Sequence, residues 1–277
     1  MRIATWNVNS LKARLERVQD WLATASPDVL LIQETKLADD AAPVMAFRMA
    51  GYELAHHGEG RWNGVAIASR VGIDEVVTNF GDGGVRNSGP GAPISVSEED
   101  FDPFDEARMI SARCGGIRVV SLYAPNGRAP GTPFYTGKLA WFERLARWLE
   151  ESCDPAEPLV LGGDFNVAPE DIDVYDPGAF VGSTHVTPAE REALARLRAW
   201  GLVDIVRRFH PEPEFYTWWD YRAGNFHKNL GMRIDHLYVS APLAERAIDA
   251  GRDRDARKGK LPSDHAPVWV DLAGPSS

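Results

Sequence analysis

Seven polar residues stand at or just beyond the ends of apolar, strand-like runs of the sequence: Asn7, Glu34, Asp164, Asn166, Asp235, Asp264 and His265. Side chains at the ends of separate strands can converge in one pocket at the edge of a sheet. Their carboxylate and amide oxygens suit Mg²⁺ or Mn²⁺, and the sequence holds no cluster of Cys and His of the kind that zinc prefers. The pattern therefore predicts a metal site with oxygen ligands.

The local motifs around these residues differ in specificity. A lone Glu after a strand is usually a solvated turn residue, and Asn is common at strand ends. The run Gly-Gly-Asp-Phe-Asn at 162–166 is more informative, because its glycines allow close backbone approach and alternation points Asp164 and Asn166 the same way. No single motif decides the case, but four of them in this order are hard to explain by core packing.

The same residues fit the hydrolysis of a phosphodiester. A cation offsets charge on the scissile phosphate, and a carboxylate orients or deprotonates the attacking water. Donors must then stabilise the pentacovalent phosphorus. His265 can act as a cationic donor if Asp235 holds its tautomer and raises its pKa.

Composition indicates one soluble globular domain. The chain has 277 residues, of which 44% are hydrophobic and 25% charged. We expect a single domain over 1–273 and a disordered tail at 274–277. Two cysteines, no apolar span of membrane length and no secretory signal pattern predict a cytoplasmic protein. The net charge of −10 lowers the expectation of nucleic-acid binding without excluding it, because a bound metal restores affinity for phosphate.

The elements that must position the polar residues alternate along the chain. Apolar or alternating runs predict strands over 29–32, 117–123, 159–161, 234–239 and 268–270. Apolar spacings of three and four predict helices over 11–22 and 139–149, and Thr187 and Pro188 open a third through 197. Strands interleaved with helices indicate a layered α/β or α+β domain. The segment 80–105, rich in Gly, Pro, Asp and Ser, is expected to be an exposed loop insertion.

Together the motifs resemble the exonuclease III family of apurinic/apyrimidinic endonucleases, within the endonuclease/exonuclease/phosphatase superfamily. The resemblance covers residues 2 to about 271 and rests on six motifs: Thr5-Trp6-Asn7-Val8-Asn9, Gln33-Glu34-Thr35-Lys36, Tyr123-Ala124-Pro125-Asn126-Gly127, Gly163-Asp164-Phe165-Asn166, Tyr216-Thr217-Trp218-Trp219-Asp220-Tyr221 and Ser263-Asp264-His265. It implies a four-layer sandwich of two packed, mixed and mostly antiparallel sheets flanked by helices. It also implies double-stranded DNA with abasic sites, nicks or 3′ ends as the substrate.

The resemblance assigns roles to individual residues. Glu34 looks like the principal metal ligand, assisted by Asn7 and Asp264. Asp164 looks like the residue that activates the water, and it could also bind metal with Asn166, which contacts the phosphate. The remaining family roles near the phosphate fall to a tyrosine, a histidine with its carboxylate partner, and two backbone-contacting residues: Tyr123, His265, Asp235, Asn126 and Arg128.

The segment 216–235 resembles the part of the DNA-repair enzymes that binds a sugar lacking its base. Trp218, Met232 and Ile234 match its apolar positions, and one of Trp218 and Trp219 is expected to lie in the core. Positive charge beside the pocket is expected from Arg222, Lys228, Arg233, Lys258 and Lys260.

Two other functions compete with this interpretation. A phosphatase or phospholipase of the same superfamily could act on a small or lipid phosphoester, and a degenerate member could bind DNA without cutting it. The segment 216–235 favours DNA over the first, and the complete set of candidate ligands opposes the second. The sequence leaves open the number of metal ions, the choice between Mg²⁺ and Mn²⁺ and the balance of endonuclease and exonuclease activity. A monomer is expected, with His56 and His57 at the surface and His185 undecided.

Overall fold

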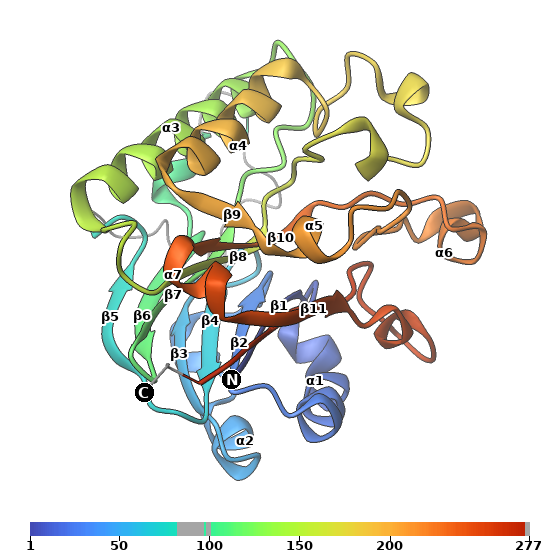
Figure 1. The fold of residues 1–277 in the computed structure, drawn as a ribbon. Helices are drawn as coiled ribbons and strands as arrows, with labels where there is room; N and C mark the ends of the chain where they lie inside the picture. The colour runs from blue at the N-terminus through green and yellow to red at the C-terminus, as the bar shows by residue number, and fades with distance from the viewer. Residues whose placement is uncertain (82–96, 98–100, 275–277) are drawn as a thin grey trace.

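Two six-stranded mixed β-sheets pack face to face, and helices cover the outer face of each (Figure 1). The protein is described by a computed structural model, which covers residues 1–81, 97 and 101–274. β1 pairs with β2, and β7 with β8, in parallel, and the other paired strands are antiparallel. The predicted four-layer sandwich is therefore confirmed.

The first sheet has the order β11-β12-β1-β2-β4-β3 and the second the order β5-β6-β7-β8-β10-β9. The strands of the first sheet are β1 (Arg2–Asn7), β2 (Val29–Gln33), β3 (Glu53–His57), β4 (Val65–Ser69), β11 (Ala247–Arg252) and β12 (Val268–Leu272). Those of the second are β5 (Asp74–Thr78), β6 (Met109–Cys114), β7 (Ile117–Tyr123), β8 (Leu159–Asp164), β9 (Leu202–Asp204) and β10 (Asp235–Ser240).

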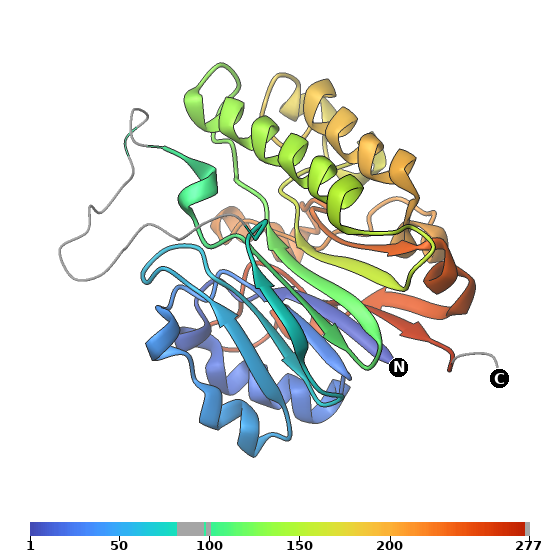
Figure 2. The same ribbon diagram turned by 90° about the vertical axis from the view of Figure 1, so that its left-hand side faces the viewer.

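Helices lie on both outer faces, and two short helices also contribute residues to the apolar cluster between the sheets. The α-helices of the described chain are α1 (Leu11–Ala25), α2 (Val44–Met49), α3 (Pro133–Ser152), α4 (Pro188–Trp200), α5 (Ile205–Phe209), α6 (Asn225–Lys228) and α7 (Ala241–Arg246). Figure 2 shows α3 and α4 side by side over the second sheet, with α1 and α2 on the opposite side of the molecule. None of the helices in the described part of the chain is long and apolar enough to cross a bilayer.

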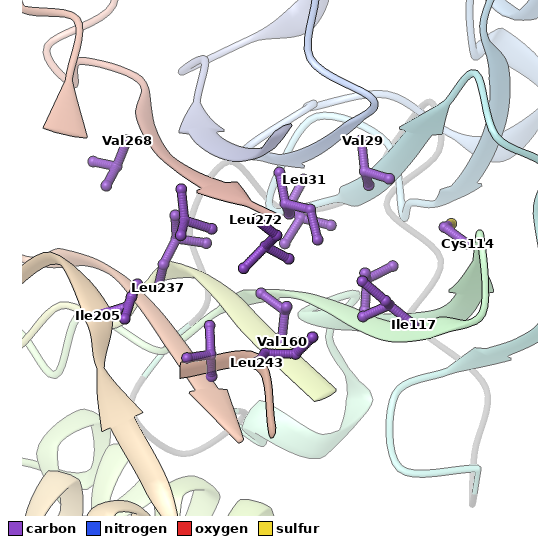
Figure 3. Packing of buried hydrophobic residues seen from close by; sticks show 14 of the residues in the cluster. Val29, Leu31, Cys114, Ile117, Val160, Ile205, Leu237, Leu243, Val268 and Leu272 are labelled. Carbon is purple, nitrogen blue, oxygen red and sulfur yellow. The ribbon is translucent and has the colours of Figure 1, made fainter. Parts of the chain in front are cut away.

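The largest apolar cluster lies between the sheets (Figure 3). Leu31 of β2 and Val160 of β8 meet there, and both are fully buried. Because each sheet also has helices on its other face, central strands such as β2 are buried at every residue, which explains the continuous apolar run at 29–32. The sandwich thus holds the strand ends in fixed positions.

The segment 80–105 is described at its two ends and at residue 97. Phe80 is buried and packs against Trp141 of α3, while Phe101 packs against Phe134. A 3₁₀ turn covers Pro103–Asp105, and Pro103 is buried. The described ends are therefore held against α3. The expected exposed loop falls mostly on residues 82–96 and 98–100, which lie outside the described residues, as do 275–277 of the expected tail.

Candidate active site

A pocket of about 190 Å³ lies at the edge of the sandwich where β1, β2 and β8 end and β10 begins. Its walls are formed by Glu34, Tyr123, Asn126, Asp164, Asn166, His185, Trp218, Met232, Ile234, Asp264 and His265. Asp164 ends β8 and stands in register with Asp235, the first residue of the antiparallel β10. All of the lining residues except His185 are singled out in the sequence, and the fold brings them together.

Close packing of β7 against β8 fixes the position of Asp164. A Cβ atom on Gly163 would lie 1.9 Å from the carbonyl oxygen of Leu122, so only glycine allows the two strands to approach this closely. The carbonyl oxygen of Asp164 then accepts the N–H of Ala124 at 2.9 Å. The packing of β7 against β8 therefore requires glycine at position 163.

The amide of Asn7 joins two carboxylates of the pocket. Its Nδ2 donates to Oε1 of Glu34 at 2.8 Å and to Oδ2 of Asp164 at 3.0 Å, while its Oδ1 accepts the N–H of Asn9 at 2.9 Å. Asn7 thus presents a donor to the carboxylates, and a role as metal ligand would require its amide to turn over. Nζ of Lys36 lies 2.9 Å from Oε2 of Glu34.

His265 is held by Asp235 from the opposite sheet. Its Nδ1 lies 3.0 and 2.9 Å from the two carboxylate oxygens of Asp235, and all these atoms are in buried residues. Burial alone lowers the pKa of an imidazole, but the charges of Asp235 and Asp164 outweigh it and raise the pKa of His265 to about 10. At neutral pH His265 is therefore a cation, and its Nε2 lies 3.7 Å from Oδ2 of Asp164.

Asp164 has the opposite electrostatic environment. Burial raises the pKa of Asp164 to about 7, although the positive charge of His265 acts to lower it. Its Oδ1 accepts the N–H of Asn166 at 2.9 Å. A carboxylate whose pKa is near neutral is suited to take a proton from water.

The carboxylates of the pocket fit a metal ion. Ligand atoms of Glu34, Asp164 and His265 lie within 4.8 Å of one another. Because His265 stays protonated, its nitrogen is a hydrogen-bond donor and not a metal ligand, so Glu34 and Asp164 are the candidate ligands of this group. The hydrogen bonds at Asp264 come from Asn9 Nδ2 at 3.0 Å and Trp218 Nε1 at 3.1 Å. Burial raises the pKa of Asp264, but His265 and these bonds hold it below its usual value.

Three apolar side chains form a second part of the pocket lining, which we call the apolar wall: Trp218, Met232 and Ile234. Met232 and Ile234 are buried, and the partly buried indole of Trp218 packs against them. The neighbouring Trp219 is fully buried in a separate cluster, in agreement with the expectation that one of the two tryptophans lies in the core. The pocket therefore combines anionic oxygens with apolar carbon.

Asn166 is the centre of a second group of contacts. Its Nδ2 donates to the carbonyl of Ala124 at 3.0 Å, and its Oδ1 accepts from Asn126 Nδ2 at 3.3 Å. Nδ1 of His185 lies 2.5 Å from its carbonyl oxygen. Burial, together with the positive charge of Lys138, lowers the pKa of His185 to about 4, so this ring is neutral and bounds the space in the pocket.

The hydroxyl of Tyr123 lies close to the carboxylate of Glu34 in the pocket. Burial, reinforced by the charge of Glu34, raises the pKa of Tyr123 well above its usual value. The phenol therefore stays protonated at any physiological pH and acts as a donor. This geometry suits a tyrosine beside a phosphate.

The expectation that Arg233 contacts DNA is wrong. The side chain is only 1% exposed, and its Nε and Nη1 lie 2.6 Å from Asp173 Oδ1 and 2.8 Å from Asp204 Oδ2. Two internal carboxylates therefore neutralise the guanidinium inside the protein. Arg233 supports the segment before β10 that carries Met232 and Ile234, and its side chain does not line the pocket.

The expectation of surface histidines at 56 and 57 is also wrong. His57 is 5% exposed, and the side chain of His56 is 4% exposed. The ring of His56 lies between Asp39 Oδ1 and Thr35 Oγ1, at 2.8 Å from each. The chain that follows β2 covers this end of β3, which the local sequence does not reveal.

The other predicted basic contacts remain at the surface. The side chain of Arg222 is 88% exposed and pairs with Asp220 at 2.6 Å. Arg128 is exposed and lies 3.5 Å from the ring centroid of Phe134. The predicted lysines Lys228, Lys258 and Lys260 are exposed as well. Their contacts with DNA stay a prediction.

Two polar residues near the site have roles that the sequence analysis misses. Asn9 donates to Asp264 and accepts from Lys36 Nζ at 2.5 Å. Its spacing of two residues from Asn7 could have indicated that it lies on the same side of the chain as Asn7. Lys138 is fully buried beneath the pocket. Its position four residues before Phe142 on the apolar face of α3 could have revealed it.

Comparison with known proteins agrees with this site. Residues 4–265 match the Endonuclease/Exonuclease/phosphatase family. The chain belongs to this family. It is 32% identical to the exodeoxyribonuclease III of Haemophilus influenzae, over 98% of this chain and all of that protein. Such relatives indicate a hydrolase that acts as a nuclease, which confirms the predicted enzyme class.

Solved structures of family members superimpose on nearly the whole chain. An AP endonuclease from Archaeoglobus fulgidus has a TM-score of 0.88 and 36% identity, covering 98% of this chain and 99% of that one. A 3′-5′ exonuclease from Neisseria meningitidis also has a TM-score of 0.88, with 38% identity and coverage of 99% and 100%. One structure of the Neisseria enzyme, described as a 3′ phosphatase, holds a product DNA hairpin.

Proposed function

We propose that the chain is a metal-dependent DNA repair nuclease that hydrolyses the phosphodiester 5′ to an abasic site. The same site would remove nucleotides and blocking groups from the 3′ ends of double-stranded DNA. One observation carries the proposal: the apolar wall of Trp218, Met232 and Ile234 lines the same small pocket as the carboxylates. A sugar without its base is cheap to extrude from a duplex, and an apolar wall favours it over a nucleotide.

The residues divide the chemistry among them. Asp164 accepts a proton from the attacking water, whose oxygen forms a bond to phosphorus while the bond from phosphorus to the 3′ oxygen breaks. The cationic His265 and the amide of Asn166 donate hydrogen bonds to the non-bridging oxygens, where negative charge grows. The products are a 3′-hydroxyl and a 5′-phosphate on the abasic sugar.

The candidate ligands of Mg²⁺ or Mn²⁺ are oxygen donors around the pocket: Glu34, Asn7, Asp164, Asn166 and Asp264. When bound, the ion supplies positive charge to the scissile phosphate and the leaving oxygen. Glu34 is suited to hold it because its carboxylate lines the pocket and is partly exposed there.

The proposed partner is double-stranded DNA with abasic sites, nicks or 3′ ends. The relatives with DNA-directed names and the DNA hairpin in the Neisseria structure support it. Phosphate contacts would come from Asn126, Arg128 and Arg222 around the pocket, with the lysines beyond them. We propose that the enzyme acts as a monomer in the cytoplasm.

The test uses purified protein with Mg²⁺ or with chelator on four substrates. These are a duplex with one abasic analogue, an intact duplex, a nicked duplex with a 3′-phosphate, and an inositol phosphate. Metal-dependent incision 5′ to the abasic analogue, lost in Asp164→Asn, is expected. Removal of 3′ groups without internal incision would restrict the function to DNA ends. Cleavage of the inositol phosphate alone would overturn the choice of DNA.

A further inference from the structure

A lysine is buried directly beneath the pocket, outside the set of residues that touch the phosphate. The ammonium of Lys138 on α3 donates to the carbonyl of Asn166 at 2.7 Å and to that of Asn126 at 3.2 Å. It also lies 2.5 Å from Oε1 of Glu190 on α4, and both side chains are 0% exposed. One buried charge therefore contacts two loops that each carry an amide lining the pocket.

Glu190 extends these contacts to a third loop. Its Oε1 accepts the hydroxyl of Thr184 at 2.8 Å and the N–H of His185 at 3.0 Å. Its Oε2 accepts the N–H and hydroxyl of Thr187, closing the capping box at the start of α4. The carboxylate that caps α4 thus also holds the segment from which His185 enters the pocket.

The loop after β7 is seated on the stem of the lysine. A Cβ atom on Gly127 would lie 2.9 Å from Cδ of Lys138 and 3.0 Å from Oγ1 of Thr184, and its φ of +84° favours glycine. Glycine therefore lets this loop lie against Lys138, so the position of Asn126 depends on that side chain.

Stability alone does not require a charged pair at this place. Two charges lose hydration on burial, and apolar residues of similar volume often stabilise a core equally well or better. What an apolar pair cannot do is donate hydrogen bonds to two carbonyl groups at once. A charged pair is explained here if its role is to hold the main chain at Asn126 and Asn166 in place.

We propose that the buried Lys138–Glu190 pair is a positioning pair for the reaction, fixing Asn126 and Asn166 against the scissile phosphate. The inference deepens the proposed function and rests on it. Lys138 acts through main-chain carbonyls and does not itself touch the substrate. Its removal is expected to slow the chemical step more than it weakens binding of DNA.

The first test compares steady-state constants on the abasic duplex. The double variant Lys138→Met/Glu190→Gln removes both charges, so no unpaired buried charge confuses the result. Because misplacement by about 1 Å costs on the order of 100-fold in rate, kcat should fall about 100-fold with KM within about threefold. The control Leu145→Ala removes buried volume seven residues further along the same helix and leaves both charges of the pair in place. Its kcat should stay near wild type at a temperature where all variants are folded.

A double-mutant cycle identifies the path of the effect. Asn166→Ala removes the amide that the pair is proposed to hold. If the pair acts through this amide, adding the double variant to Asn166→Ala should cost only about two- to threefold more in kcat. Full multiplication of the two losses, or a kcat of Lys138→Met/Glu190→Gln within about threefold of wild type, would overturn the proposal.

Hydrogen exchange separates this proposal from the function on which it rests. In Lys138→Met/Glu190→Gln the main-chain amides of 124–128 and 164–168 should exchange faster than in Leu145→Ala, with no substrate present. Equal exchange in the two variants contradicts the positioning role. If the double variant exchanges faster than Leu145→Ala but the wild-type protein cleaves no DNA, the structural role of the pair is supported and the proposed substrate is refuted.

Discussion

His265 and Asp235 connect the two sheets of the sandwich at the pocket. His265 precedes β12 of the first sheet, Asp235 opens β10 of the second, and His265 Nδ1 lies 2.9 Å from Asp235 Oδ2. Both side chains are at most 4% exposed. The contact therefore fixes the charge of the imidazole and the relative position of the two strand ends in one interaction.

Asp235→Asn should shift the alkaline limit of activity. In the wild type His265 keeps its donor proton until the pH approaches its pKa of about 10. Without the charge of Asp235 that pKa falls, so kcat/KM should begin to decline several pH units lower, with a loss of about 100-fold at pH 8. The measurement is kcat/KM against pH from 6 to 10. An unchanged alkaline limb would show that His265 is not the titrating donor, and Asp255→Asn, an exposed carboxylate, serves as the control.

Asp164→Asn should be inactive and yet more stable than the wild type without metal. The pKa of Asp164 is about 7 in the folded protein, compared with 3.8 for an ordinary aspartate. This raised pKa stabilises the folded state fully below pH 3.8, and the stabilisation is lost as the pH rises to 7. Asparagine cannot ionise. Above pH 7 with chelator, the free energy of unfolding of the variant should therefore exceed that of the wild type by on the order of 1–3 kcal/mol. The comparison is denaturant unfolding at pH 8 and pH 4.

At pH 4 the difference between Asp164→Asn and the wild type should nearly vanish, because the wild-type carboxyl is then protonated. A variant that is less stable at pH 8 would mean that hydrogen bonds to the carboxylate outweigh the cost of its burial. Mg²⁺ should reverse the order by stabilising the wild type alone.

Local pattern predicts the layers of the fold and the polar residues at the strand ends, whereas the other predicted pocket residues come from the resemblance to the family: Tyr123, Asn126, Trp218, Met232 and Ile234. Buried strands such as 29–32 are continuous apolar runs, and each strand end places a polar residue beside it. Asp164 and Asn166 share a face by simple alternation. Convergence at one edge then follows from the packing of two sheets.

Charge partners could not be predicted in the same way, because they come from distant parts of the chain. Arg233 stands in a basic stretch near the pocket, but its partners Asp173 and Asp204 reach it only through the folded sheet. His56 is covered by the chain after β2 for the same reason. A charged residue in sequence shows its chemistry, and only the fold shows whether solvent reaches it.

Trp218 has two contributions that separate substitutions can resolve. Its ring forms part of the apolar wall, and its Nε1–H donates to Asp264 Oδ2. Trp218→Phe keeps most of the ring and removes the donor, whereas Trp218→Ala removes both. For incision at the abasic analogue, Trp218→Ala should lower kcat/KM by about 10–100-fold and Trp218→Phe by less than about tenfold.

Trp200→Ala, a partly buried tryptophan on α4 outside the pocket, controls for general loss of packing. On the nicked duplex with a 3′-phosphate, both Trp218 variants should lose less kcat/KM than on the abasic duplex. That substrate has no abasic sugar to place against the apolar wall. Equal losses on both substrates would assign Trp218 to the metal site through Asp264 and remove it from sugar recognition.

Glu34→Gln should weaken metal binding while keeping the shape of the pocket. The amide retains an oxygen for Asn7 Nδ2 but lacks the charge that a divalent cation requires. The Mg²⁺ concentration for half-maximal activity should rise by at least about tenfold, against no change in Glu16→Gln, an exposed acid on α1. Thermal unfolding provides a second readout that needs no DNA: Mg²⁺ should raise the melting temperature of the wild type and of Glu16→Gln, because the ion binds only the folded state. A Glu34→Gln protein stabilised by Mg²⁺ as strongly as the wild type would place the ion on Asp164 and Asp264 instead.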